Sequence, residues 1–313
     1  MYSVTDLLGP AYVSARWGFY LAAFLIIGAS SFAPFFLDRS TFHQRFPDQA
    51  RNLVRRAAVI GLVASIVALL CCLLRLWLQS RTLLDPEEPL TRDFLRAVLD
   101  STWGQGWKRQ VSSSVIAIAG FGVARNWRSG WVFVVAAALG LGLTTGLTGH
   151  AASAEAGRFG WLIDAGHVGA GGIWIGGLFV LMLAGLPACR GLEGEVRSSA
   201  HRLLVGLFSR RALVVAPLTV GFGALLGVQY LGWRWPLSLF GSSYGWALAV
   251  KIGLVIVIAV LGGLNWRYVQ PRLEQPDGER LFRRTGGGEV LFSVLVLGVT
   301  AVLVALSFAE HGS

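Results

Sequence analysis

The sequence predicts an all-α fold, that of a polytopic integral membrane protein with about eight transmembrane helices. Apolar residues make up 54% of the chain. They occur in uncharged blocks of about 20 residues, the length of a helix that crosses a bilayer. Short strands of alternating polarity, typical of membrane barrels, are not found in the sequence. The net charge of +10 comes almost entirely from arginine, as in loops that set membrane topology.

The apolar blocks place the helices in order along the chain. The first block follows Asp6 and precedes a cluster of arginines, so we expect a retained helix and not a cleaved signal peptide. The fifth helix is expected to end at Pro187. The predicted helices cover residues 11–37, 54–78, 104–124, 129–149, 161–186, 212–230, 244–266 and 289–308.

The longest polar connection, residues 79–103, contains an amphipathic pattern. Leu90, Phe94 and Val98 recur at helical spacing, opposite Arg92. This pattern predicts a helix that lies on the membrane surface.

Arginine placement predicts the orientation. Seventeen of the 27 lysines and arginines fall after the first, third, fifth and seventh predicted helices. Because basic loops stay in the cytoplasm, both chain ends are expected outside. Arg16 and Arg75 are assigned to the outer face. His43 and His201, in the basic loops, are expected to be solvated and without a functional role.

Residues 149–177 bring together most of the chemistry in the chain. His150 ends the fourth predicted helix, and Asp164 and His167 lie three residues apart, on one face of the fifth. Ionisable groups within a membrane are costly and usually functional, so the stretch predicts a metal site or a proton relay. The alternative is that His150 caps its helix and His167 hydrogen-bonds a neighbouring helix. Glu155 and, near the outer terminus, Glu310 and His311 are candidates to complete or feed the site.

Small residues on the predicted helices favour close packing. Four-residue glycine pairs let two helices approach each other. Such glycines are Gly142 and Gly146, Gly223 and Gly227, and the group Gly169, Gly171, Gly172, Gly176 and Gly177.

A faint repeat suggests two parallel four-helix halves. Thr102-Trp103-Gly104 opens the third helix and Ser243-Tyr244-Gly245 opens the seventh, each shortly before a lysine, Lys108 or Lys251. Chance similarity is the alternative. The predicted division is residues 1–149, with an outer amphipathic segment at 79–103, and residues 150–313, which carry the site. Lys251 is expected to pair with a carboxylate, not to bind metal.

Several classes of protein do not fit the sequence. Cys71, Cys72 and Cys189 show no zinc or disulfide spacing and are expected to pack as small apolar residues. No basic and aromatic platform indicates nucleic-acid binding. No phosphate loop, nucleotide fingerprint or nucleophile with a base was identified, so an enzyme is not predicted.

Several segments together resemble the copper resistance protein D family, the inner-membrane partners of periplasmic copper-binding proteins. The resemblance covers most of the chain and is densest from about residue 149 to 273. The matching segments are Thr102-Trp103-Gly104, Gly149-His150-Ala151-Ala152, Asp164-x-x-His167 with Trp174-x-Gly176-Gly177, Phe208-Ser209-Arg210, Tyr244-Gly245 with Lys251, and Asn265-Trp266-Arg267 with Pro271-Arg272.

The resemblance implies a copper-binding protein of the bacterial cytoplasmic (inner) membrane that takes up copper from the periplasm, with both termini periplasmic. His150 and His167 would be nitrogen ligands. Asp164 would be either a ligand or the acceptor that fixes the His167 tautomer. Methionine is scarce, with only Met1 and Met182, so a thioether ladder for Cu(I) is not indicated.

The sequence leaves the donor and two rival functions open. The chain has no fused soluble copper-binding domain, so a separate periplasmic copper-binding protein is the expected donor. One rival is a b-type haem electron-transfer protein with axial histidines, although His150 at a helix end is shallow for such a ligand. The other is a scaffold subunit in which the histidines only pack.

Overall fold

The predicted all-α class is confirmed by a computed structural model, which describes residues 9–85, 87–144, 160–232, 239–275 and 277–310. Within these ranges the chain forms helices and turns and contains no strand. Six of the described helices are long and apolar enough to cross a membrane, and Gly130–Thr144 is a shorter apolar helix. The protein is therefore a multi-pass membrane protein, and a total of eight spans stays a prediction.

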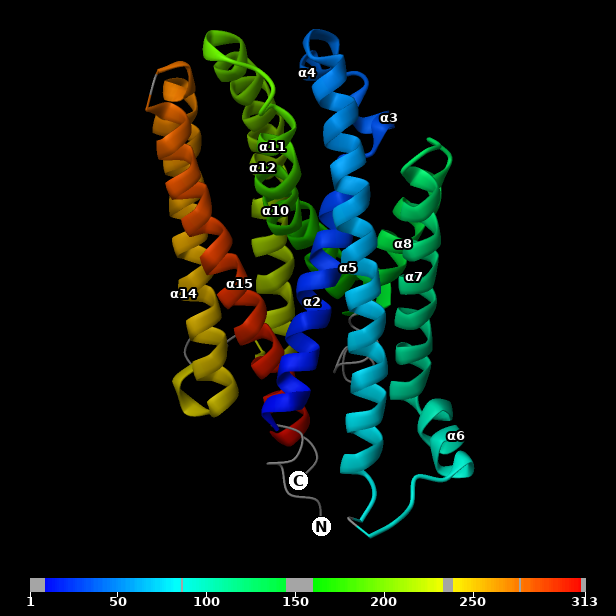
Figure 1. Cartoon of the computed structure of the whole chain (residues 1–313). Helices are drawn as coiled ribbons and strands as arrows, with labels where there is room; N and C mark the ends of the chain where they lie inside the picture. The colour runs from blue at the N-terminus through cyan, green and yellow to red at the C-terminus, as the bar shows by residue number, and fades with distance from the viewer. Residues whose placement is uncertain (1–8, 86, 145–159, 233–238, 276, 311–313) are drawn as a thin grey trace.

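The long helical segments run side by side in an elongated bundle (Figure 1). They are α2 (Pro10–Ser30), α5 (Pro47–Thr82), α7 (Thr102–Ala124), α8 (Gly130–Thr144), the segment Gly160–Ala188, α12 (Gly194–Leu231), α14 (Ser243–Leu264) and α15 (Gly278–Glu310). Short helices occur in the connections: α3 (Pro34–Leu37), α4 (Thr41–Arg45), α6 (Arg92–Asp100), η6 (Leu239–Gly241), η7 (Asn265–Val269) and η8 (Gln270–Glu274).

Several predicted boundaries are wrong. The first helix ends at Ser30, not at residue 37, and Pro34 begins the separate helix α3. Helices α12 and α15 begin at Gly194 and Gly278, far before the predicted 212 and 289. Hydropathy detects only the apolar part of a helix, whereas these helices continue into polar sequence that still packs against the bundle.

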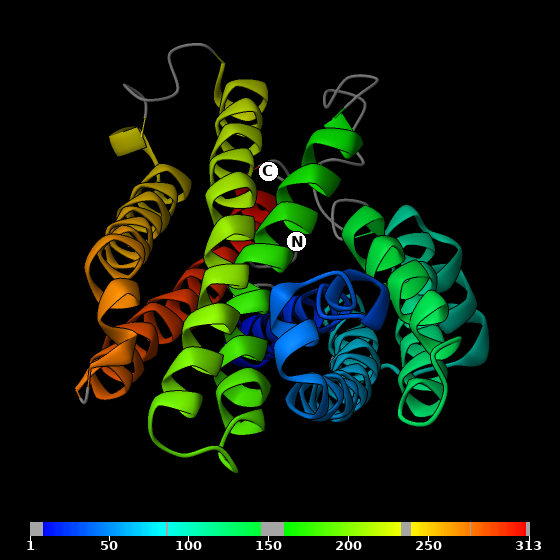
Figure 2. The same ribbon diagram turned by 90° about the horizontal axis from the view of Figure 1, so that it is seen from above.

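Helix α2 lies at the centre of the bundle, as seen from above in Figure 2. It contacts α5, α8, α15 and the middle of the segment Gly160–Ala188. Its closest approach is at Gly28, where an added Cβ would overlap the backbone of Gly176, and a Cβ on Gly176 would overlap the carbonyl group of Phe24. The predicted close packing at Gly176 is therefore present, and it is packing of backbone on backbone.

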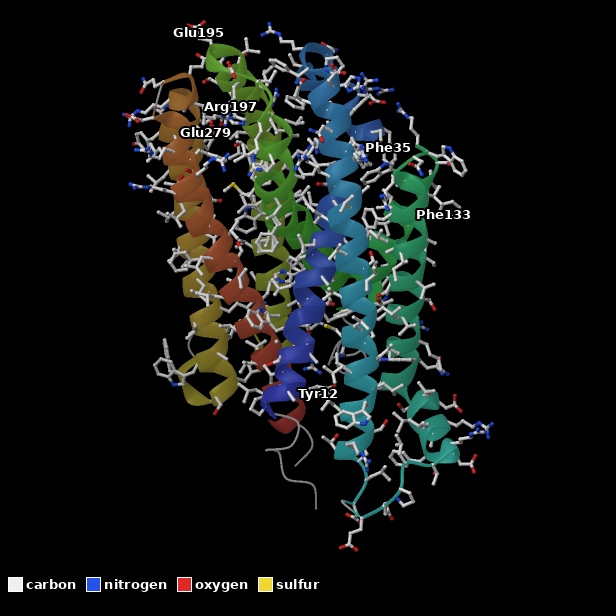
Figure 3. All side chains as sticks on the ribbon, in the orientation of Figure 1. Tyr12, Phe35, Phe133, Glu195, Arg197 and Glu279 are labelled. Carbon is white, nitrogen blue, oxygen red and sulfur yellow. The ribbon has the colours of Figure 1, made fainter. Side chains whose placement is uncertain are left out.

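The arginine-rich connections gather at one end of the bundle. Figure 3 shows Glu195, Arg197 and Glu279 at this end and Tyr12 towards the opposite end. Arg197 bonds Glu279 at 2.8 Å, the Arg211 guanidinium donates to the Ser31 carbonyl oxygen at 2.7 Å, and Arg128 pairs with Asp38. These contacts tie the helix ends together. The start of α2 and the end of α15 lie at the other end (Figure 1).

The polar connection 79–103 is only partly the predicted amphipathic helix. Residues 79–82 extend α5, and the helix itself is α6, whose Val98 is buried against the bundle. The Thr91 hydroxyl oxygen caps α6 by accepting from the Phe94 N–H at 3.3 Å. Helix α6 packs on α7.

The two repeated segments begin their helices in the same way. The Ser101 hydroxyl oxygen accepts from the Gly104 N–H at 3.1 Å, and the Ser242 hydroxyl oxygen accepts from the Gly245 N–H at 3.0 Å. The lysines that follow differ: Lys108 pairs with Asp100 at 3.2 Å, whereas Lys251 is partly buried and makes no ion pair with a described residue. The shared caps are a local likeness, and the division into two halves stays a prediction.

Candidate metal centre

The helical segment Gly160–Ala188 positions Asp164 and His167. It begins as α9 (Gly160–Gly171) and continues through η4 (Gly172–Gly176), α10 (Gly177–Val180), η5 (Leu181–Gly185) and α11 (Leu186–Ala188). The turns η4 and η5 are π-helical, a local widening that occurs often at functional sites. At about 1.5 Å per residue, His167 lies about 10 Å from the start of α9, at the end of the bundle away from the arginines.

The His167 imidazole lies against α12, at a position that is formed by Thr219 and Gly223 and that we call its seat. Its Nδ1 lies 2.9 Å from the Thr219 carbonyl oxygen, and the seat lies two residues past Pro217, which interrupts the backbone bonding of α12. A Cβ on Gly223 would lie 3.0 Å from the ring's Cε1 atom, so glycine at this position gives the ring its space. His167 therefore points into the bundle and not at lipid.

This seat sets the His167 tautomer. A carbonyl oxygen only accepts, so Nδ1 must carry the proton and Nε2 presents its lone pair. Nε2 makes no hydrogen bond with any residue that the structure describes. The hydrogen-bond acceptor at Nδ1 is thus the Thr219 carbonyl oxygen, whereas Asp164 was one of the acceptors considered in the sequence analysis. A neutral imidazole held in this way is the usual form of a histidine metal ligand.

Asp164 lies one turn before His167 and is partly buried. Lys251 of α14 acts electrostatically on both Asp164 and His167 without a direct ion pair to Asp164. The predicted pairing of Lys251 with a carboxylate is not present as an ion pair among the described residues and stays a prediction. A cation beside the site offsets the negative charge of Asp164, which lowers the cost of placing that carboxylate in the membrane.

The other predicted ligands, His150, Glu155 and His311, lie outside the described residues. Among the residues that are described, no group of three or more histidine, cysteine, aspartate or glutamate side chains is arranged to hold a metal ion. The described part of the candidate centre is therefore His167 with its seat on α12, together with Asp164.

Comparison with known proteins agrees with the segments singled out in the sequence. The profile of the "Copper resistance protein D-like, N-terminal domain" matches residues 5–161, half of the chain, and that of "Copper resistance protein D" matches residues 202–303. The chain belongs to the copper resistance protein D family.

A protein with a named function is also similar to this chain. The copper transport protein CutJ of Bacillus subtilis (strain 168) is 28% identical over 315 residues. The match covers 97% of the present chain but 53% of CutJ, so the chain spans about half the length of that relative. No solved structure matches the chain.

The burial of two arginines was not expected from the sequence. Arg16 of α2 and Arg75 of α5, which were counted on the outer face, are 1% and 2% exposed inside the bundle. Arg16 donates a hydrogen bond to the Tyr12 hydroxyl oxygen at 3.3 Å, and Arg75 donates one to the side-chain amide oxygen (Oε1) of Gln110 at 3.0 Å. Both act electrostatically on Tyr20, as Asp164 also does. Arginine inside an apolar block was the signal that could have identified them.

His201 is also buried, so its interpretation as a solvated bystander is wrong. It is 1% exposed and lies 3.6 Å from a Glu279 carboxylate oxygen. Ala200, Leu204 and Val205 are buried beside it, and this helical stripe could have placed His201 on the buried face of α12. Helix α12 begins before His201, because this stripe of buried residues packs against the bundle.

Cys189 follows the predicted behaviour of the cysteines. It is buried just beyond α11, and burial raises the pKa of its thiol to about 11. The thiol therefore stays neutral near pH 7 and packs as a small apolar group. Cys71 and Cys72 are likewise free thiols.

A buried carboxylate on α15 was missed because the helix was expected to begin there. Glu289 lies well inside α15 and is 4% exposed. It accepts a hydrogen bond from the Asn265 amide, and Asn265 accepts one from the Thr285 hydroxyl. These bonds satisfy polar groups that would otherwise be costly in the apolar interior.

Gly223→Ala is expected to weaken metal binding by roughly tenfold, because the new methyl group presses on the His167 ring and disturbs its bond to Thr219. Gly221→Ala is the matched control, since a Cβ there meets nothing within 4 Å. Isothermal titration of the two purified variants with copper checks this prediction. Equal affinities for the two variants would show that the seat does not matter.

Proposed function

We propose that this protein binds a copper ion near the outer end of its bundle and carries it across the bacterial inner membrane into the cytoplasm. The observation that supports this most is the seat of His167. An imidazole inside a membrane helix has its Nδ1–H fixed by a backbone carbonyl and its Nε2 lone pair left for a ligand. Membership of the copper resistance protein D family supports copper as the ion.

The proposed ligands are the Nε2 atom of His167, the imidazole of His150 and the carboxylate of Asp164. Glu155 and His311 are proposed to complete or feed the site. Two imidazoles alone suit the nearly linear coordination of Cu(I), whereas Cu(II) requires further nitrogen or oxygen donors. A separate periplasmic copper-binding protein is the proposed donor.

The charges of the bundle support the proposed inward direction of transport. Seventeen of the 27 basic residues lie in the connections at one end or in the adjoining parts of α5, α12 and α15, which supports a cytoplasmic location for that end by the positive-inside rule. His167 lies nearer the opposite end of its helical segment, which supports entry of copper from outside. The polar groups of Glu289, Asn265 and Thr285, nearer the arginine-rich end, offer oxygen donors on the way inward.

Cellular copper content tests this function. In a bacterial host lacking its own copper importer, the wild-type chain is expected to raise cell-associated copper several-fold over the empty vector. His167→Asn is expected to return it to the vector level. Mass spectrometry of washed cells measures the metal, and membrane abundance of each variant is checked by immunoblot. Copper content below the vector level would indicate export and contradict the proposed direction.

A further inference from the structure

A cavity of about 520 Å³ lies between α12 and the turns η7 and η8, at the arginine-rich end of the bundle. Arg202 and Arg210 line it from α12, and Arg267 and Gln270 line it from the turns. The Gln270 side chain packs closely on Gly206, where a Cβ would lie 2.9 Å from the Gln270 amide nitrogen. The cavity lies on the same helix as the His167 seat, and its nearest lining residue, Arg210, is about 14 Å along α12 from Thr219.

The charges of this arginine cavity are only partly neutralised. Arg202 pairs with Glu274 at 2.9 Å. Arg210 uses its Nε to donate to the Gly206 carbonyl oxygen at 3.3 Å. Among the described residues, no hydrogen bond or ion pair involves the Arg267 guanidinium or the terminal nitrogens of Arg210. The cavity therefore offers donors of net positive charge to an anion, and guanidinium groups match phosphate oxygens in geometry.

The surroundings of the arginine cavity are those of a lipid headgroup layer. Trp266, which lines the cavity, is 47% exposed, and the neighbouring Tyr268 is also exposed, as is typical of aromatic residues at a membrane surface. Most of the apolar surface of α12 and α14 is not covered by the protein. Acyl chains can lie along these two helices while a headgroup occupies the cavity above them.

We propose that the arginine cavity binds the phosphate group of an anionic phospholipid from the leaflet at this end of the bundle. Basic pockets between membrane helices on the cytoplasmic side commonly hold such headgroups. Arg210 and Arg267 contact the phosphate, and Arg202 remains paired with Glu274. The bound lipid fills the space between α12 and the η7–η8 turns and holds them in place.

Native mass spectrometry of the full-length protein in detergent tests this site. Titration with phosphatidylglycerol should show a saturable bound lipid, whereas phosphatidylcholine should bind weakly. Arg210→Gln with Arg267→Gln should weaken phosphatidylglycerol binding by roughly 30-fold, from the loss of two charges near the lipid. The matched control is Arg280→Gln with Arg284→Gln, which removes two exposed charges at the same end outside the cavity.

The single variant Arg267→Gln removes a guanidinium that makes no hydrogen bond or ion pair with a described residue, so the fold should be kept, and it should weaken binding by roughly fivefold. Unchanged phosphatidylglycerol binding in the double variant, or equal losses in the control, would refute the proposal. Competition with inorganic phosphate tests whether the cavity binds a free anion instead of a lipid. If inorganic phosphate displaces phosphatidylglycerol at millimolar concentration, the cavity is a phosphate site and the lipid assignment is wrong.

Discussion

His167→Asn is expected to abolish stoichiometric copper binding. Asparagine places an amide donor near the position of the imidazole Nδ1, so it can still donate to the Thr219 carbonyl oxygen, but it has no counterpart of the Nε2 lone pair. The variant therefore separates metal ligation from helix packing. Copper bound per protein, measured after gel filtration, is expected to fall from about one to background.

His43→Ala is the matched control for this experiment. His43 lies at the arginine-rich end, partly exposed and 3.8 Å from Asp38, so its removal is expected to leave copper binding unchanged. His201 is not a suitable control for copper binding, because it is buried beside Glu279 and contributes to the packing of α12. A His167→Asn protein that still binds one copper would move the site away from α9.

Gly176→Ala is expected to have the largest effect on stability. Alanine in place of a helical glycine gains about 1 kcal/mol in helix propensity. The new Cβ, however, overlaps the Phe24 carbonyl group of α2, and backbone cannot rotate away as a side chain can. Overpacking of a rigid contact costs about 1–3 kcal/mol or more, so we expect net destabilisation and a lower melting temperature in detergent.

Two other glycines of the same helical segment provide graded controls. The atoms nearest to a Cβ on Gly172 belong to the side chain of Ile27 and not to backbone, and a Cβ on Gly169 meets nothing within 4 Å. Gly169→Ala is therefore expected to be neutral or slightly stabilising, and Gly172→Ala intermediate. If all three variants melted together, the Gly28–Gly176 crossing would not be the point that fixes α2 in the bundle.

The sequence predicted the membrane helices well and their ends poorly. Apolar length follows directly from bilayer thickness, so blocks such as the one that becomes α14 were found within a few residues. The predicted first residues of α12 and α15 were 18 and 11 residues too late, because the first turns of these helices lie in polar sequence and are helical through tertiary packing. His201 and Glu289 were misread for the same reason.

Within the candidate centre, the sequence by itself determined that Asp164 and His167 share one helix face, since spacing along a helix is local geometry. It also determined the class of fold and, through its segment motifs, the family. Only the tertiary structure decided that Thr219 and Gly223 of α12 form the seat of His167, and that Arg16 and Arg75 turn inward. The contacts of His167 with Thr219 and Gly223 join residues that lie more than 50 positions apart in the chain, and no local pattern records which helices will meet. Burial of a charged group depends on neighbours supplied by other helices, so it is settled when the helices pack.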